Sequence, residues 1–268
     1  MSGLCWRNSS MDKHYTQVNA EIWDRVNECL TDKTTAISHE DYLAAKEGAL
    51  NIPLAGVRPV PRSWFPPLKD SDVLALACGG GQQAPVFAAH GARVTVTDVS
   101  ARQLDHERLV AQREGYDIRI IEADMSQTFP FEDASFDLIF NPVSNCYIRD
   151  ILPMQRECAR VLRPGGVLMT AFVKEEHFLF DPDFQREDAL ISRHPLPFDP
   201  LRDLTEAQRR KQLDNRMPLA FSHTLTEQLG GLMQAGFELT DIFEDGDGGG
   251  LFDRWMQSYV AIRAVRKG

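Results

Sequence analysis

The chain has 268 residues, of which 43% are apolar and 25% are charged, and its formal net charge is −10. This composition is typical of a folded globular protein and excludes the disordered and fibrous classes. No apolar run reaches the roughly 18 residues of a membrane helix, and the first residues lack the apolar stretch of a secretory signal peptide. Lys and Arg are not clustered, so we expect neither nucleic acid nor a membrane as a partner.

The five cysteines are scattered along the chain and form no Cys-x-x-Cys pair. An odd number of cysteines without metal-ligand spacing indicates reduced thiols and no zinc site. We therefore predict a cytoplasmic protein without a bound metal. The cysteines are Cys5, Cys29, Cys78, Cys146 and Cys158.

Residues 15–50 are predicted to be helical because their apolar residues recur at helical spacing. Ser38, followed three residues later by an acidic residue, is typical of a helix start. A proline-rich connector follows at 53–67, and prolines at this density stop helices. We predict a helical cap with its connector over 1–66 and a second domain over 67–268. The apolar stripe consists of Ile22, Val26, Cys29 and Leu30.

From residue 73 onward, short apolar or β-branched runs alternate with helical patterns. This alternation is typical of a parallel sheet with helices on both faces. Prolines and charged residues at 173–217 break the pattern and indicate an insertion. Thr224 with Glu227 is a capping-box pattern and predicts a helix that Gly236 ends. Strands are predicted at 73–78, 93–97, 118–121, 136–140, 166–172, 237–243 and 256–265, and helices at 82–90, after a cap at Ser100 and after a cap at Asp150.

A glycine-rich loop, 79–81, joins the first predicted strand to the first helix. Glycine lets a backbone approach a ligand closely, and a helix N-terminus offers free N–H groups. Ligands of open parallel sheets bind beyond the carboxyl ends of the strands. Asp98 follows the second strand, where a carboxylate can accept hydrogen bonds from ribose hydroxyls. The spacing Gly79-x-Gly81-x-x-Ala84 also matches the dinucleotide fingerprint, so the loop alone does not identify its ligand.

Further features follow the third and fourth strands. Asp124 can accept a hydrogen bond from an adenine amino group, and Met125 can pack on the ring. Asn141 and Pro142 end the fourth strand, and residues 162–166 form a tight turn before the fifth.

In this order and spacing, these segments resemble the class I S-adenosylmethionine-dependent methyltransferases. A narrower resemblance is to bacterial methyltransferases of unassigned substrate that carry a Gly-Gly-Gly-Gln-Gln loop. The wider resemblance is carried by residues 73–81, 98, 123–125, 136–140 and 162–166, and the narrower one adds 61–65, 141–145 and 261–264.

The resemblance implies an α/β fold with a Rossmann-like, doubly wound, seven-stranded sheet. Its order is 3-2-1-4-5-7-6, with the last strand antiparallel. The implied cofactor is S-adenosylmethionine, which becomes S-adenosylhomocysteine. Gly79 and Gly81 would line its methionine part, Asp98 its ribose, and Asp124 with Met125 its adenine.

Two positions depart from the family pattern: Ala75 and Ala77 stand where many members carry an acidic residue and a glycine. A missing carboxylate can weaken the hold on the loop or on the amino-acid end of the cofactor. The residues expected at the cofactor are Ala77, Cys78, Gly79, Gly81, Gln83, Asp98, Val99, Gln103, Ala123, Asp124, Met125, Asn141 and Pro142.

Methyl transfer from a sulfonium is a direct displacement, which depends on positioning and is favoured by a dry site. We therefore expect the N-terminal helices and the insertion to form a lid over a small-molecule acceptor. His177 and His223 are candidate general bases, although a structural role stays open for both. The candidate acceptor contacts are Trp23, Asn145, Tyr147 and His223.

Two alternatives remain at this stage. The glycine loop and Asp98 also fit an NAD(P)-dependent Rossmann oxidoreductase, although we identify no Tyr-x-x-x-Lys pair or other hydride-transfer constellation. A relative that binds the cofactor or a partner protein without catalysis is the other alternative, and Ala75 favours it. The acceptor atom and the oligomeric state stay open.

Overall fold

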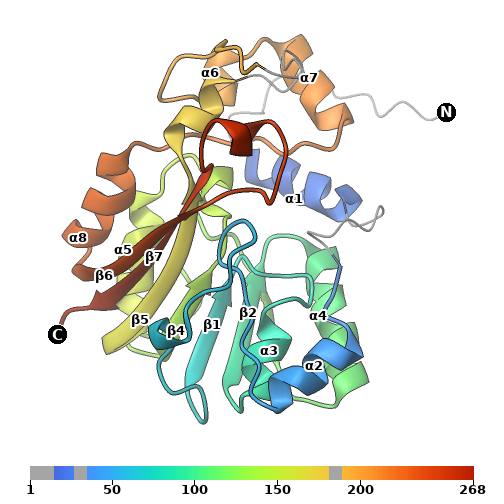
Figure 1. Cartoon of the computed structure of the whole chain (residues 1–268), viewed down its shortest axis with the longest axis vertical. Coiled ribbons are helices and arrows are strands. Elements are labelled where there is room, and N and C mark those ends of the chain that lie inside the picture. Colours follow the sequence, from blue (N-terminus) through green and yellow to red (C-terminus); the bar gives the residue numbers. More distant parts are fainter. Residues whose placement is uncertain (1–14, 27–34, 181–188) are drawn as a thin grey trace.

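A computed structural model describes residues 15–26, 35–180 and 189–268, and a seven-stranded sheet lies at its centre (Figure 1). The strands are β1 (Asp72–Leu76), β2 (Arg93–Asp98), β3 (Arg119–Glu122), β4 (Phe136–Asn141), β5 (Leu162–Val173), β6 (Phe237–Asp245) and β7 (Tyr259–Arg266). Their order is β3-β2-β1-β4-β5-β7-β6. Strands β1 to β5 run parallel, and β7 runs antiparallel to both neighbours. The implied sheet order and the antiparallel last strand are confirmed.

Helices cover both faces of the sheet, as predicted (Figure 1). Ser100 caps α4, because its side chain accepts a hydrogen bond from the Gln103 N–H. Asp150 accepts the N–H of Leu152 at 3.0 Å, one residue before the position assigned as the cap of α5. The helices are α1 (Tyr15–Val26), α2 (His39–Lys46), α3 (Ala84–Ala89), α4 (Ala101–Glu114), α5 (Leu152–Val161), α6 (Pro200–Asp203), α7 (Glu206–Asp214) and α8 (Gly231–Gln234).

The central strand β1 separates two apolar cores. Because side chains of a strand alternate between faces, Val73 and Ala75 pack with α3. Leu74 and Leu76 pack on the opposite face with α5 and α8. All four residues are buried, which explains why this strand is an unbroken apolar run in the sequence.

Several sequence predictions differ from the structure in detail, as three elements illustrate. β1 ends two residues early because Ala77 already has a φ of +48° and begins the turn. β5 begins four residues early and includes the turn predicted before it. The capping box at Thr224 forms, but a wide π-helical turn, Thr226–Gly230, separates it from α8.

The N-terminal region divides between two cores. Ile52, just before the connector, and Leu54 and Trp64 within it belong to the α3-side core of the sheet. α1 instead packs against the insertion and the segment after it, in a third cluster formed by Val18, Ile22, Leu213, Leu219 and Phe221. Cys29 and Leu30 lie outside the described residues. The domain boundary at residue 66 stays a prediction.

Candidate cofactor and acceptor site

The residues predicted to bind the cofactor lie at or after the carboxyl ends of β1, β2, β3 and β4. These strands are neighbours in the sheet, so their ends meet at one edge. The Asn141 side-chain amide donates to the Leu76 carbonyl at 2.9 Å, which joins the ends of β4 and β1. The Ala123 N–H donates to the Asp98 carbonyl at 3.0 Å, which joins the segment after β3 to β2. The predicted cofactor residues are thus assembled at a single edge.

The glycine loop is fastened to the rest of the chain through its backbone. All three glycine N–H groups have acceptors within the chain, because the nearby α4 and the end of β2 provide them. Gly79 donates to Asp98 Oδ2 at 3.0 Å, Gly80 to the Gln103 carbonyl at 3.0 Å, and Gly81 to Glu107 Oε1 at 2.6 Å.

Close packing on α4 explains why the loop needs glycine. A Cβ atom on Gly79 would lie 2.6 Å from the Cβ of Gln103, and one on Gly81 would lie 2.7 Å from a methyl of Val110. Gly81 also has a φ of +74°, which L side chains rarely adopt. Any larger residue would push the loop away from the helix.

Asp98 is a partly exposed carboxylate at the end of β2. The N–H groups of Gly79, Val99 and Ser100 bond to it. Burial raises the pKa of Asp98 above its usual value although these bonds lower it. A carboxylate has about four acceptor positions. Asp98 therefore keeps acceptor capacity for a ribose hydroxyl, and in this respect the site fits the implied cofactor.

Glu107 is a site residue that the sequence analysis missed. Its side chain is 0% exposed, and burial raises its pKa to about 8. The available signal was an acidic residue between Leu104 and Val110, which both lie on the buried side of α4. Buried acids are rare unless they have a specific role.

The segments after β3 and β4 form the next part of this edge. Asp124 Oδ1 accepts the N–H of Ser126 at 2.8 Å, and Met125 is buried with its sulfur 3.9 Å from Ser144 Oγ. The Asn141 amide also donates to Ser144 Oγ at 2.7 Å. These contacts connect the predicted adenine residues to the end of β4.

Cys78 and Gln83 lie against each other at the start of the loop. The Cys78 thiol donates to Gln83 Oε1 at 3.2 Å. Burial, with Glu107 and Asp98 nearby, raises the pKa of Cys78 well above its usual value. Cys78 is therefore a neutral thiol that packs and donates a hydrogen bond.

The structure brings the four candidate acceptor residues together as two contacting pairs, Trp23 with Tyr147 and His223 with the Asn145 backbone. The rings of Trp23, on α1, and Tyr147, after β4, meet edge to face with centroids 5.3 Å apart. Asn145 and His223 are buried nearby: Asn145 donates to Gln228 Oε1 at 3.0 Å, and His223 Nε2 lies 3.0 Å from the Ile148 carbonyl oxygen. These contacts support a role for Asn145 and His223 in shaping the loop that carries Tyr147.

The two candidate bases differ in environment. Burial lowers the pKa of His223, so its imidazole is neutral at pH 7. His177 is partly exposed; its Nδ1 lies 3.3 Å from Ser258 Oγ and its ring stacks on Phe252 at 4.0 Å. A catalytic role of either histidine stays a prediction.

Known proteins are similar to this chain in sequence and in fold. A methyltransferase-domain family pattern matches residues 74–170. The chain is 38% identical over 248 residues to the uncharacterized methyltransferase YbaJ of Bacillus subtilis (strain 168), a match that covers 92% of this chain and 97% of that protein. The chain belongs to the class I S-adenosylmethionine-dependent methyltransferases.

Other methyltransferases match more distantly. A ubiquinone biosynthesis O-methyltransferase of Chelativorans sp. (strain BNC1) is 30% identical over 107 residues, which is 40% of this chain and 42% of that protein. An S-adenosylmethionine-dependent methyltransferase structure from Mesorhizobium loti has a TM-score of 0.61 and 19% identity over 82% of this chain and 100% of that chain. This likeness shows the shared fold.

Family membership disfavours the oxidoreductase alternative, and one expectation needs correction. The sequence does contain a Tyr42-x-x-x-Lys46 spacing. It lies on α2, where Tyr42 is buried and stacks on Tyr116. Figure 1 shows α2 beside α3 and α4, well away from α1. Packing on Tyr116 therefore accounts for Tyr42.

In the methyltransferase, α1 joins the start of α4 to the loop after β4 and to the segment after the insertion. The Asp24 carboxylate accepts the Ser100 hydroxyl at 2.7 Å and the Arg102 N–H at 3.2 Å, both at the start of α4. The Asn19 amide donates to the carbonyls of Tyr147 (3.2 Å) and Leu219 (2.9 Å). α1 is thus bound both to α4, near the predicted cofactor residues, and to the loop that carries the predicted acceptor residue Tyr147.

Replacing Asp24 by Ala is expected to loosen α1. Loss of hydrogen bonds to a charged group costs roughly 1.5–3 kcal/mol, so local opening should increase about tenfold or more. Trypsin cleavage after Arg25 measures this opening, with Glu21→Ala on the same helix as the control. Equal cleavage rates in the wild type and Asp24→Ala would show that the hydrogen bonds of Asp24 do not hold α1 in place.

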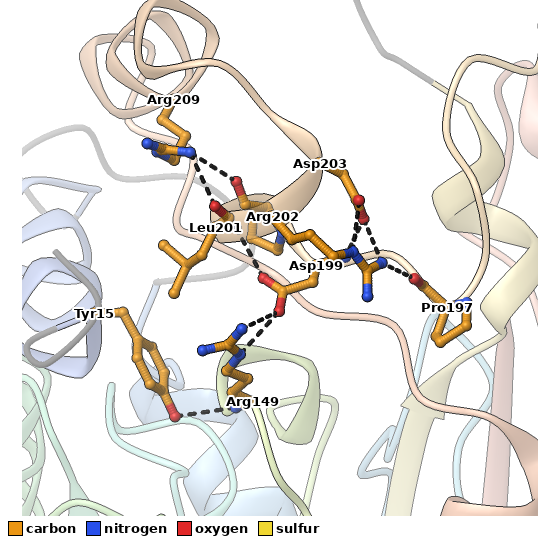
Figure 2. A network of polar contacts seen from close by, with 9 residues as sticks. Tyr15, Arg149, Pro197, Asp199, Leu201, Arg202, Asp203 and Arg209 are labelled. Carbon is orange, nitrogen blue, oxygen red and sulfur yellow. Dashed lines mark hydrogen bonds and ion pairs between the residues drawn. The ribbon is translucent and has the colours of Figure 1, made fainter.

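A polar network fastens the insertion to the loop after β4 (Figure 2). The Arg149 guanidinium lies 2.7 Å from Asp199, which caps α6 through the Leu201 N–H. The backbone N–H of Arg149 donates to the Tyr15 hydroxyl at 3.0 Å. Figure 2 also shows Arg209 bonded to backbone carbonyls of the α6 region. Arg149 therefore joins α1, the insertion and the predicted acceptor loop.

Two further observations apply to the part of the methyltransferase that the structure describes. It contains no group of three or more His, Cys, Asp or Glu residues placed to hold a metal ion. None of its helices combines the length and the apolar character needed to cross a bilayer.

Proposed function

We propose that this methyltransferase transfers a methyl group to a small-molecule acceptor that binds beneath α1, beside Trp23 and Tyr147. The contact between these two rings carries the proposal, because it joins the cap to the loop after β4. α1 and the insertion would form the lid, and their shared apolar cluster supports their moving as one unit.

The proposed cofactor position is the carboxyl edge of β1 to β4. There Asp98 would accept hydrogen bonds from the ribose, and Asp124 with Met125 would contact the adenine. When bound, S-adenosylmethionine supplies an electrophilic methyl group on a sulfonium. The glycine loop, held by Asp98 and α4, would position the amino-acid end.

The residues around the proposed acceptor position are suited to orienting an uncharged or aromatic molecule and excluding water. Burial raises the pKa of the Tyr147 phenol well above its usual value, so the phenol stays protonated and can donate a hydrogen bond. Trp23 provides an apolar face. The net charge of −10 disfavours nucleic acid, and the similar protein named for ubiquinone biosynthesis supports a small-molecule acceptor.

Replacing Trp23 by Ala is expected to reduce methyl transfer at least about tenfold, because a half-buried aromatic side chain contributes on the order of 1–3 kcal/mol. Binding of S-adenosylhomocysteine should change less than threefold. The assay follows labelled methyl groups into a panel of phenols, amines and carboxylic acids, with duplex DNA and RNA as further acceptors.

Trp255→Ala provides the matched control, because Trp255 is 63% exposed on the β6–β7 connection. Transfer to nucleic acid, or unchanged transfer to every acceptor in Trp23→Ala, would contradict the proposed acceptor site. Cofactor binding without transfer to any member of the panel would favour the non-catalytic alternative.

A further inference from the structure

A buried carboxylate lies directly behind the glycine loop. Glu107 Oε1 accepts the Gly81 N–H at 2.6 Å, while Oε2 is buried without a hydrogen-bond partner. Within residues 15–26, 35–180 and 189–268, no Lys or Arg forms an ion pair with this carboxyl group. Burying the Glu107 carboxyl group therefore costs free energy, which its single hydrogen bond to Gly81 only partly offsets.

Packing alone does not explain an acidic residue at this position. A leucine would fill a similar volume between Leu104 and Val110 without burying an ionisable group. Replacing a buried charge by an apolar side chain is often neutral or stabilising. What Glu107 provides and leucine does not is an acceptor for the Gly81 N–H.

Gly81 is held through both of its backbone polar groups. Its N–H donates to Glu107, and its carbonyl accepts the Ile37 N–H at 2.8 Å. Ala75, near the end of β1, and Ala77, in the turn after it, offer no alternative acceptor side chain, since both are apolar. Glu107 is thus the only described side chain that bonds to the Gly81 N–H.

We propose that Glu107 is a positioning residue that fixes the glycine loop in the conformation that binds the cofactor. Three consecutive glycines lose much conformational freedom on ordering. A loop that occupies its binding conformation only part of the time binds its ligand more weakly by that fraction. Glu107 acts through the loop and does not touch the ligand. The inference rests on the cofactor position proposed above.

Calorimetric titration with S-adenosylhomocysteine tests the role of the acceptor oxygen. Glu107→Gln keeps an amide oxygen for Gly81 and should bind within threefold of the wild type. Glu107→Leu keeps the volume but loses the acceptor, and should bind at least tenfold more weakly. Asp105→Asn, an exposed acid on the same helix, is the control and should be unchanged.

The outcomes separate the two proposals. Wild-type affinity in Glu107→Leu, or equal losses in Glu107→Leu and Glu107→Gln, would overturn the positioning role and leave the cofactor site intact. No binding by the wild type would overturn the cofactor site and, with it, this inference.

If Glu107→Leu does not fold, hydrogen exchange of the Gly81 backbone N–H in the wild type tests the proposal instead. An N–H bonded to a buried carboxyl group should exchange far more slowly than that of an unstructured glycine, and its chemical shift should move as Glu107 titrates. Glu107→Gln should keep the slow exchange and lose the titration. Fast exchange of Gly81 in the wild type would overturn the proposal.

Discussion

Replacing Asp98 by Ala is expected to weaken S-adenosylmethionine binding by at least about 100-fold, because hydrogen bonds to a charged group are worth roughly 1.5–3 kcal/mol each and the ribose offers two hydroxyls. The substitution also removes the acceptor of the Gly79 and Ser100 N–H groups, so the loop itself is loosened. Calorimetric titration measures the loss directly.

Glu122→Ala is the matched control for this experiment. Glu122 ends β3, lies in register with Asp98 and is exposed. The Glu122→Ala variant should bind the cofactor with wild-type affinity. Wild-type affinity in Asp98→Ala would instead show that the ribose is held elsewhere. Cofactor binding by the wild type, measured at decreasing pH, gives a second check. Protonation of Asp98 removes its charge, so the affinity for the cofactor should fall as the pH drops through the raised pKa of Asp98.

Glu107→Gln is expected to be more stable than the wild type at pH 9, by an amount on the order of a few kcal/mol. The pKa of Glu107 is about 8 in the folded protein and near 4.5 for an ordinary glutamate. The folded state therefore keeps a proton that the unfolded state has released over this pH window. By linkage, the stability of the wild type falls as pH rises from about 4.5 to about 8 and then levels off.

Urea unfolding at pH 4, 6, 8 and 9 measures this difference. Glutamine does not titrate, so the gap between variant and wild type should be small at pH 4 and widen up to pH 8. Asp105→Asn should show no such trend, because Asp105 is exposed. A gap that is constant with pH, or a wild type more stable at pH 9, would contradict the buried environment of Glu107.

The central sheet was predictable because its signal is local. Val73 to Leu76 form an apolar run, the β-branched residues of β2 follow at the expected distance, and the glycines mark the turn between them. Residues that share the carboxyl edge could also be named, because parallel strands bring their ends together. The resemblance supplied the sheet order, which periodicity alone does not determine.

The contacts of α4 and α1 were not predictable in the same way. The Gly81–Glu107 bond joins residues 26 apart, and the Asn19–Leu219 bonds join residues 200 apart. Neither pair has a spacing pattern in the sequence. The sequence analysis therefore considered the loop only for its approach to a ligand, whereas in the folded chain the loop N–H groups also hold the loop in place.

A crystal structure of the protein with S-adenosylhomocysteine tests the central claim most directly. The ligand should lie across the carboxyl ends of β1 and β2, with both ribose hydroxyls within hydrogen-bond distance of the Asp98 carboxylate and its sulfur facing Tyr147. A ligand bound elsewhere, or ribose hydroxyls held by other groups, would contradict the account.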